Sequence, residues 1–371
     1  MNTATTSTVS VDPALSLLAR LRMFPELANT EKETSARLKH FLTEYKPTRL
    51  VDHVGGFGLL AEWGSGVKGP TVMIRVPMDA SPAGHLYGND GHMALAAGLA
   101  PLLQKNTPPV GSVALLFQPA SVLGTGARAV YLDDKFRPFK PELIIGFRAI
   151  PGHEPGSVLF REGDITTASK GLTIKLHGRG TDISTHDDSH PLGALIRLSE
   201  QILDLENDDK FEQFVQTNIA HAHLGQHDFY TAPEYAELSA TIRAQKRREL
   251  DKMAKRIVDY AQIAGQIHAL GIDVTWHDAF EAVKNPEGSS EWINRWCTKN
   301  ELPLIHMEQP FRWSDDFGVF RENLNAVYFG LGCGLSARSM GSPDFSFPEA
   351  LIAPGIQALW TLVNDSLDRL K

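Results

Sequence analysis

The sequence predicts an α/β domain, built on a mixed sheet with helices on both faces, into which an α+β unit is inserted. In the first part of the chain, short apolar runs alternate with amphipathic stretches of helical spacing, which is typical of an α/β sheet. Between residues 172 and 277 the pattern changes to alternating runs and one long amphipathic helix. After residue 288 the first pattern resumes, so the middle segment is predicted to be an insertion.

The elements of the first part follow from apolar spacing and from the residues that begin or end helices. Leu18 and Leu21 belong to a helical apolar stripe that Pro25 ends. Thr30 and Glu33 have the spacing of a capping box, which predicts the start of a second helix. Continuous apolar runs are typical of strands buried on both faces. The predicted order is helices at 13–23 and 30–45, strands at 58–63 and 71–77, a helix at 91–104, a strand at 112–118, a helix at 126–133 and a strand at 143–147.

The middle of the chain predicts a compact α+β unit, because strands of alternating character surround two helices. Its predicted order is a strand at 172–177, a helix at 191–205, strands at 220–224 and 236–243, a helix at 250–270 and a strand at 272–277. A helix at 290–299, a strand at 326–331 and a helix at 349–370 then complete the first pattern. We therefore expect a disordered tail at 1–12, an α/β domain formed by 13–170 and 288–371, and an insertion at 171–287.

The composition argues against several classes of protein. The chain has 371 residues, 42% of them hydrophobic, which is enough to bury two cores. Its formal net charge of −8 argues against nucleic-acid partners, which require a basic surface. Cys297 and Cys333 are too few for a disulfide framework, and no apolar run reaches the roughly 20 residues of a membrane-spanning helix. Because residues 1–12 also lack the pattern of a signal peptide, we expect a cytoplasmic protein without membrane partners.

Five short segments, spread over nearly the whole chain, carry a family resemblance. They are Pro25-Glu26-Leu27 with Glu31 and Thr34, Arg75-Val76-Pro77-Met78-Asp79-Ala80, His85-Leu86-Tyr87-Gly88-Asn89-Asp90-Gly91-His92, Phe117-Gln118-Pro119-Ala120 with Gly124, Gly126 and Ala127, and Ser342-Pro343-Asp344-Phe345. In this order they resemble the signature segments of the M20 family of aminoacylases and amidohydrolases. Each segment alone is weak, but five in order are strong evidence of shared descent.

The resemblance implies a fold and a reaction. The family has an α/β catalytic domain interrupted by a smaller lid domain, which forms a dimer contact in many members. Its reaction is hydrolysis of an amide, usually that of an N-acyl amino acid. Two divalent ions such as zinc, manganese or cobalt activate a water and polarise the carbonyl group, and a Glu beside them moves the proton.

The resemblance places residues that cannot hold a metal where the family has its ligands. The five former ligand positions are Tyr87, Asn89, Val122, Arg148 and Gly341, and the former general-base position is Ser121. Val122 and Gly341 offer no donor atom, and Arg148 brings a positive charge to the place of a cation. The sequence therefore predicts that the two-metal site and the general base are lost, and that no metal cofactor is bound.

The resemblance also implies which residues contact a ligand. Arg243 stands where the family's lid Arg binds the carboxylate of the substrate, a role suited to a guanidinium group. Tyr230 stands where the family has an Asn that contacts the substrate. Together with Arg148, Tyr87 and Asn89, these two residues form the predicted ligand-binding set, and the predicted ligand is a small carboxylate.

Catalytic residues are left unassigned. His85, Asp79 and His153 are candidates because they are expected at the former metal cleft, and Ser121 with His85 could imitate a nucleophile and its base. A further polar cluster is interpreted as a solvated loop, because it lies in a turn before Pro191. This cluster is His186, Asp187, Asp188 and His190.

Three functions remain open from the sequence. The first is a pseudo-hydrolase that binds a carboxylate-bearing, acyl-amino-acid-like ligand and forms a homodimer through the lid. The second is a repurposed enzyme that acts on an amino-acid derivative without metal. The third is a working amidohydrolase whose metal ligands have moved. The residues considered for the third are His85, Asp79, Asp90, His92 and His153.

Overall fold

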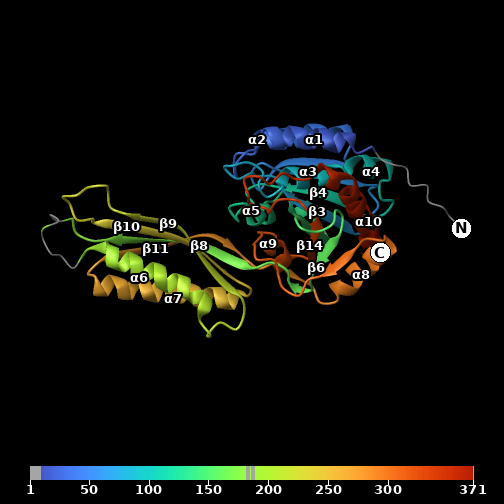
Figure 1. Ribbon diagram of the computed structural model, residues 1–371. Helices are drawn as coiled ribbons and strands as arrows, with labels where there is room; N and C mark the ends of the chain where they lie inside the picture. Colours follow the sequence, from blue (N-terminus) through green and yellow to red (C-terminus); the bar gives the residue numbers. More distant parts are fainter. Residues whose placement is uncertain (1–9, 181–183, 185–188, 371) are drawn as a thin grey trace. The chain divides into compact units, whose positions relative to one another are not determined.

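A computed structural model describes residues 10–180, 184 and 189–370, which form two compact units (Figure 1). The first unit comprises Met1–Ile165, Lys284–Gln309 and Asp315–Lys371, and the second comprises Thr166–Val283 and Pro310–Ser314. The sequence-based bounds of the insertion are 171–287. Residues 1–9 of the predicted tail lie outside the described part of the chain, as do His186, Asp187 and Asp188.

An eight-stranded mixed sheet forms the centre of the first unit, as predicted, with the order β1-β2-β4-β3-β5-β14-β6-β13. The central strands β4, β3, β5 and β14 run parallel, and β1, β2 and β6 add antiparallel pairs. Every residue of the four central strands is buried, because helices cover both faces. The strands are β1 Arg49–Val54, β2 Gly58–Gly64, β3 Thr71–Pro77, β4 Ser112–Gln118, β5 Leu143–Ile150, β6 Val158–Phe160, β13 Leu304–His306 and β14 Ala326–Gly332.

The helices of the first unit correct three sequence-based predictions. The first helix begins at Asp12, inside the predicted tail. The helix predicted at 91–104 is two helices, α3 and α4, because Pro101 lies in the first turn of α4 and cannot continue a hydrogen-bond ladder. The helix predicted at 349–370 begins with a 3₁₀ turn. The helices are α1 Asp12–Met23, α2 Lys32–Glu44, α3 Asn89–Ala97, α4 Ala100–Lys105, α5 Gly126–Leu132, α8 Ser289–Lys299, α9 Gly318–Asn323 and α10 Ile352–Leu370.

The start of α2 also differs from the predicted capping box. The Thr30 hydroxyl donates to the carbonyl of Leu27 and does not cap the helix. Instead, the carboxylate of Glu26 accepts the N–H groups of Glu33 and Thr34, at 3.1 and 2.6 Å. A carboxylate at the positive end of the helix dipole supplies both hydrogen bonds and charge, so Glu26 takes the capping role.

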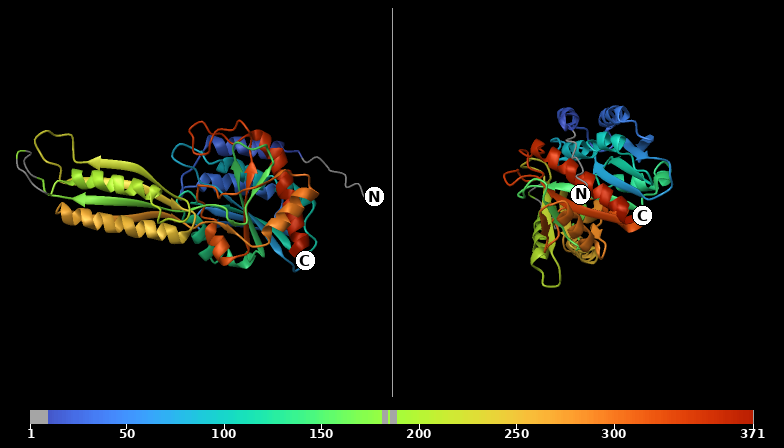
Figure 2. Two further views of the ribbon diagram at one scale, coloured as in Figure 1. Left: turned by 60° about the horizontal axis from the view of Figure 1, so that its bottom comes forward. Right: turned by 90° about the vertical axis from the view of Figure 1, so that its right-hand side faces the viewer.

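The second unit is a four-stranded antiparallel sheet of order β11-β8-β10-β9, with helices α6 and α7 on one face (Figures 1 and 2). Alternate residues of β10 are buried, so one side of the sheet packs on the helices and the other does not. Buried Leu250, Met253 and Ile257 on α7 complete this core. The elements are β8 Ala168–His177, α6 Pro191–Leu203, β9 Val215–Leu224, β10 Tyr235–Ala244, α7 Arg247–Ile267 and β11 Gly271–Phe280.

Within the described residues, no helix combines the length and the apolar character that crossing a membrane requires.

Candidate functional site

Asp315 lies at the centre of a buried ionic network in the first unit. Its Oδ1 atom accepts from Arg75 Nη1 at 2.9 Å and from the N–H of Phe317 at 3.0 Å. Its Oδ2 atom accepts from Arg148 Nη2 at 2.7 Å and from the Tyr328 hydroxyl at 2.9 Å. Four donors, two of them cationic, therefore surround one carboxylate in the core.

Asp316, the next residue, is surrounded in the same way. Its Oδ1 atom accepts from Arg75 Nη2 and from the Ser121 hydroxyl, the latter at 2.8 Å. Its Oδ2 atom accepts from Gln118 Nε2 at 2.7 Å and from the N–H of Ala127 at 2.9 Å. Arg75 thus bridges the two acids, and it also donates to Ser121 Oγ at 3.0 Å.

The parallel strands explain why these side chains meet. Arg75 lies on β3, Gln118 ends β4, Arg148 lies on β5 and Tyr328 lies on β14. These four strands are neighbours in the sheet, and the acids come from the loop before α9. The crevice at the carboxyl ends of parallel strands is the usual place for a functional site in such sheets.

Burial and the neighbouring cations shift the pKa values of the two acids in opposite directions. Burial alone would raise the pKa of Asp315, but the guanidinium groups of Arg75 and Arg148 lower it below its ordinary value. Asp316 forms its ion pair with Arg75, but burial outweighs this charge and raises the pKa of Asp316 to about 6. Burial alone would lower the pKa of Arg148, but Tyr328 and Asp315 beside it raise the pKa further. Arg148 is therefore a permanent cation.

The segment that contains Ser121 is held by two more buried acids. The N–H of Ala120 donates to Glu31 Oε1 at 2.8 Å, and the N–H of Val122 donates to Asp79 Oδ2 at 2.7 Å. Ala120 has a φ of 50°, a left-handed conformation that costs energy in a residue with a side chain. These bonds to the neighbouring N–H groups keep the segment in this conformation.

The other residues that the sequence places at metal-ligand positions lie close to one another. Tyr87 is 40% exposed, and its ring packs against Gly341, where a Cβ atom would lie 3.5 Å from Tyr87 Cε1. The N–H of Gly341 donates to the carbonyl of Leu86 at 2.8 Å. Asn89 is buried, and its Nδ2 atom donates to the carbonyl of Asp79 at 2.7 Å. The structure thus brings Tyr87 beside Gly341, and both Asn89 and Val122 beside Asp79.

The candidate histidines have other environments. The Nε2 atom of His92 accepts from the N–H of Ala149 at 2.9 Å, and burial lowers the pKa of His92 well below its ordinary value, so its ring is neutral. Burial also lowers the pKa of the half-buried His85. His153 lies in a turn whose backbone pairs with Gly334. Asp90 forms an ion pair with Arg22 at 3.0 Å.

Two sequence-based hypotheses, a Ser121–His85 nucleophile and base and a set of relocated metal ligands, find no support among the described residues. No hydrogen bond joins Ser121 to His85 there, and the Ser121 hydroxyl bonds to Arg75 and Asp316 instead. Among the described residues, no three or more His, Cys, Asp or Glu side chains form a group that could hold a metal ion.

The second unit carries the two remaining candidates at opposite ends of β10. Arg243 lies near the end of the strand, and its Nη1 atom donates to the Ser314 hydroxyl at 3.1 Å. Tyr230 lies in the loop before the strand, where it is 79% exposed and lines a cavity of about 770 Å³. Arg243 is eight positions beyond Tyr235 along the strand, which corresponds to about 27 Å. Within one chain, Tyr230 and Arg243 cannot both contact one small ligand.

The structure also reveals residues that sequence reasoning missed. No role was predicted for Glu31, Arg75, Asp315, Asp316 or Tyr328. One local signal is present in the sequence: Asp315 and Asp316 directly precede the aromatic Phe317. Carboxylates that are buried beside apolar residues require hydrogen-bond or ionic partners from elsewhere in the fold.

Asp79 provides a pH test of the site. Burial raises the pKa of Asp79 to about 6, well above the value of 3.8 in an unfolded chain. The folded state therefore keeps a proton that the unfolded state releases, and the stability that Asp79 contributes falls as the pH rises from about 4 to about 6. We expect Asp79→Asn to remove this dependence and to raise the unfolding free energy at pH 7.5 by up to about 3 kcal/mol.

The asparagine would still accept from the N–H of Val122, so the hydrogen bond is kept. Urea unfolding of both proteins between pH 4 and 8 measures the difference, with the exposed Asp134→Asn as the control. A stability of Asp79→Asn that falls with pH as steeply as that of the unaltered protein would contradict the assignment.

The family model described as peptidase family M20/M25/M40 matches residues 69–365. An N-acetyl-L-cysteine deacetylase of Bacillus subtilis is 23% identical, over 94% of this chain and 86% of its own length. An N-acetyldiaminopimelate deacetylase of Geobacillus thermodenitrificans is 24% identical, over 87% of this chain and 90% of its own length.

Two solved structures share the fold. A dinuclear metal-binding peptidase of the M20 family from Bacillus subtilis superposes with a TM-score of 0.77 at 20% identity, covering 96% of this chain and 98% of that one. An aminobenzoyl-glutamate utilization protein from Klebsiella pneumoniae has a TM-score of 0.77 at 17% identity, covering 96% of each chain. At these identities the likeness concerns the fold alone.

Proposed function

The chain belongs to peptidase family M20/M25/M40, and from that premise we propose that it is an amidohydrolase homologue that binds a small carboxylate-bearing, acyl-amino-acid-like ligand without the two-metal reaction. The observation that carries the proposal is Arg148. This residue stands at a former metal-ligand position, and it is a permanent cation that pairs with the buried Asp315.

The side chains at the matched positions do not fit a pair of divalent ions. Zinc, manganese and cobalt are bound by thiolate, imidazole or carboxylate groups. Tyr87 offers a phenol, the Asn89 amide donates to Asp79, and Val122 has no donor atom. A divalent ion beside Arg148 would also meet a like charge in a low-dielectric site, which is costly. No step through a metal is therefore part of the proposal.

An anion fits the same place. The Arg148 side chain is 10% exposed, whereas that of Arg75 is fully buried, so Arg148 is the cation of the network that a ligand from solvent can reach. A guanidinium group presents planar N–H donors that match a carboxylate. Asp315 and Tyr328 fix the Arg148 side chain in place, so little side-chain entropy is lost when an anion binds.

The carboxylate ligand can be tested directly. Isothermal titration in a buffer with EDTA is expected to detect binding of N-acetyl-L-methionine, and Arg148→Gln is expected to weaken it about tenfold or more, since a charge-assisted hydrogen bond is lost. The methyl ester of the same compound lacks the carboxylate, so its binding should be weak and unaffected by Arg148→Gln. Arg137→Gln, which removes an exposed arginine, is the control.

Metal content is measured on the same sample. Elemental analysis is expected to find far less than one zinc, manganese or cobalt ion per chain. A near-stoichiometric content, with release of free methionine that EDTA abolishes, would overturn the proposal in favour of a working amidohydrolase.

We also propose that the second unit forms a homodimer contact. Leu192, Ile196 and Leu203 of α6 are exposed and, by their helical spacing, lie on one face. Ile263 and Ile267 of α7 are exposed too. Apolar residues gathered in this way favour contact with another protein surface. Light scattering of the same sample should give the mass of a dimer, and the mass of a single chain would contradict this part of the proposal.

A further inference from the structure

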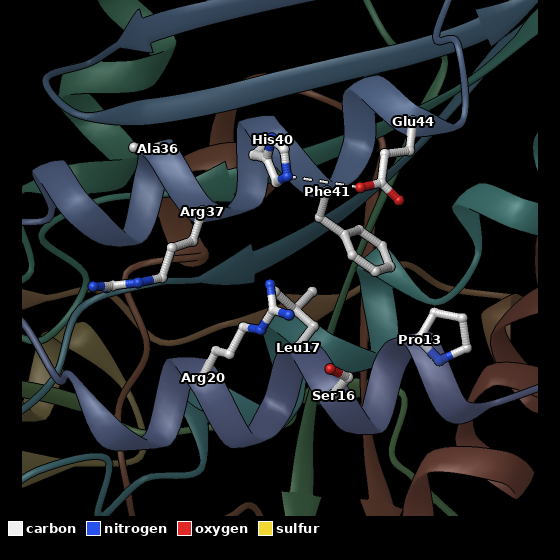
Figure 3. Close-up of a pocket in the computed structure, with 9 residues that line it drawn as sticks. All are labelled: Pro13, Ser16, Leu17, Arg20, Ala36, Arg37, His40, Phe41 and Glu44. Atoms are coloured by element: carbon white, nitrogen blue, oxygen red, sulfur yellow. Dashed lines mark ion pairs between the residues drawn. The ribbon is translucent and has the colours of Figure 1, made fainter.

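A groove between α1 and α2 of the first unit forms a cavity that is separate from the Asp315 network (Figure 3). Its volume of about 370 Å³ is at the lower end of the range for small-molecule sites. None of its residues belongs to the Asp315 network. It is lined by Pro13, Ser16, Leu17, Arg20, Ala36, Arg37, His40, Phe41 and Glu44.

Two arginines give the groove its charge. Arg20 extends from α1 toward α2, and Arg37 extends from α2 (Figure 3). Among the described residues, neither side chain forms an ion pair, although the chain carries 44 acidic residues against 36 basic ones. The one acid of the lining, Glu44, is paired with His40 at 3.7 Å. The local charge of the groove is therefore positive on an acidic chain.

Arg37 supplies a donor that lacks a partner. Its guanidinium carbon lies 4.7 Å from the centre of the Phe24 ring. Stacking on a ring leaves the in-plane N–H groups of a guanidinium group able to bind an oxyanion. Its Nη1 atom is buried and has no hydrogen-bond partner among the described residues. A buried donor left unsatisfied costs free energy that a bound acceptor would recover.

The remaining lining is apolar. Leu17 is buried in α1, and Phe41 is partly buried in α2 against the same core. Pro13 lies at the same end of the groove as Phe41 (Figure 3). An apolar wall next to a pair of cations is the arrangement that an organic anion requires, because the wall covers its carbon skeleton and the cations bind its charged oxygens.

We propose that this groove is a binding site for a small organic anion. The oxyanion, a carboxylate or a phosphate, lies between Arg20 and Arg37, and the apolar part of the ligand packs on Leu17 and Phe41. The proposal does not depend on the function proposed for the Asp315 network, because the two sites share no residue.

Isothermal titration of the full chain with benzoate and phenyl phosphate tests the proposal. At least one of them is expected to bind, and the tighter one identifies the oxyanion. Benzyl alcohol should not bind, and inorganic phosphate should bind at least tenfold more weakly than the tighter ligand. Arg20→Gln and Arg37→Gln are each expected to weaken binding about tenfold, whereas the exposed helix variant Arg128→Gln should leave it within twofold.

The Arg148→Gln variant distinguishes binding in the α1–α2 groove from binding at the Asp315 network. Arg148→Gln should leave binding of the tighter ligand unchanged, while it weakens binding of N-acetyl-L-methionine. Absence of binding by both probes, equal binding of inorganic phosphate, or unchanged binding by both groove variants would each overturn the proposal. Because Arg20 is exposed, Arg20→Gln is expected to unfold at the same temperature as the unaltered protein, so its binding result can be interpreted.

Discussion

Replacing Arg75 with methionine is expected to lower the free energy of unfolding by about 3–5 kcal/mol, because it removes one partner from a fully buried ion-pair network. Methionine fills much of the same volume but donates no hydrogen bond. Asp315 would keep Arg148 and Tyr328, but Asp316 would lose its ion pair with Arg75. Urea unfolding at pH 5 and at pH 8 measures the loss.

The loss should be larger at pH 8 than at pH 5. The pKa of Asp316 is already raised to about 6 by burial, and removing Arg75 raises it further, so at pH 5 the acid is protonated and needs no cation. The matched control is Arg137→Met, which breaks an exposed ion pair with Asp134 and should cost less than about 1 kcal/mol. A loss for Arg75→Met as small as that of the control would show that the network does not stabilise the fold.

The second large effect is expected from Gly126→Ala, which should lower the free energy of unfolding by about 3 kcal/mol or more. Gly126 begins α5, and a Cβ atom there would overlap the carbonyl oxygen of Pro119. The backbone must then shift, and this shift disturbs the bond from the N–H of Ala127 to Asp316. Thermal unfolding measures the stability, and titration with N-acetyl-L-methionine measures the effect on the site.

Gly171→Ala is the control for Gly126→Ala. It lies on β8, where a Cβ atom would be 3.4 Å from the Cβ atom of His277, an ordinary contact. Its effect on the free energy of unfolding should stay within about 1 kcal/mol and be neutral or stabilising, because glycine inside a strand is less stable than alanine by about that amount. An unfolding temperature for Gly126→Ala equal to that of the unaltered protein would contradict the close approach to Pro119.

Much of the architecture was predictable because it depends on local pattern. Apolar runs identified the strands β3, β4 and β5 with nearly the correct bounds, since a strand buried on both faces is mostly apolar. Arg75 and Arg148 are exceptions, and both are paired with Asp315. Helical apolar spacing identified α7 and α10. The ordered motifs identified the family, which the match over residues 69–365 confirms.

Local signals failed where several partners compete for the same role. The pair Thr30 and Glu33 has the sequence of a capping box, yet Glu26 caps α2 because its carboxylate reaches the same N–H groups from the preceding turn. Spacing likewise did not separate α3 from α4. In both cases the predicted and the observed structure differ by only one or two hydrogen bonds. This difference in free energy is smaller than the packing free energy of the whole fold, so packing decides between them.

The sequence by itself identified the family, which the match over residues 69–365 confirms, and it predicts that Tyr87, Asn89, Val122, Arg148 and Gly341 stand at the metal-ligand positions. Only the tertiary structure decided what Arg148 does, because its partner Asp315 is 167 residues away along the chain and Arg75 reaches the same acid across 240 residues. Tertiary structure also decided that Tyr230 and Arg243 are separated by the length of β10. An ion pair depends on a distance of a few ångströms, and distances between remote residues are set by how strands pair and not by neighbours in the sequence.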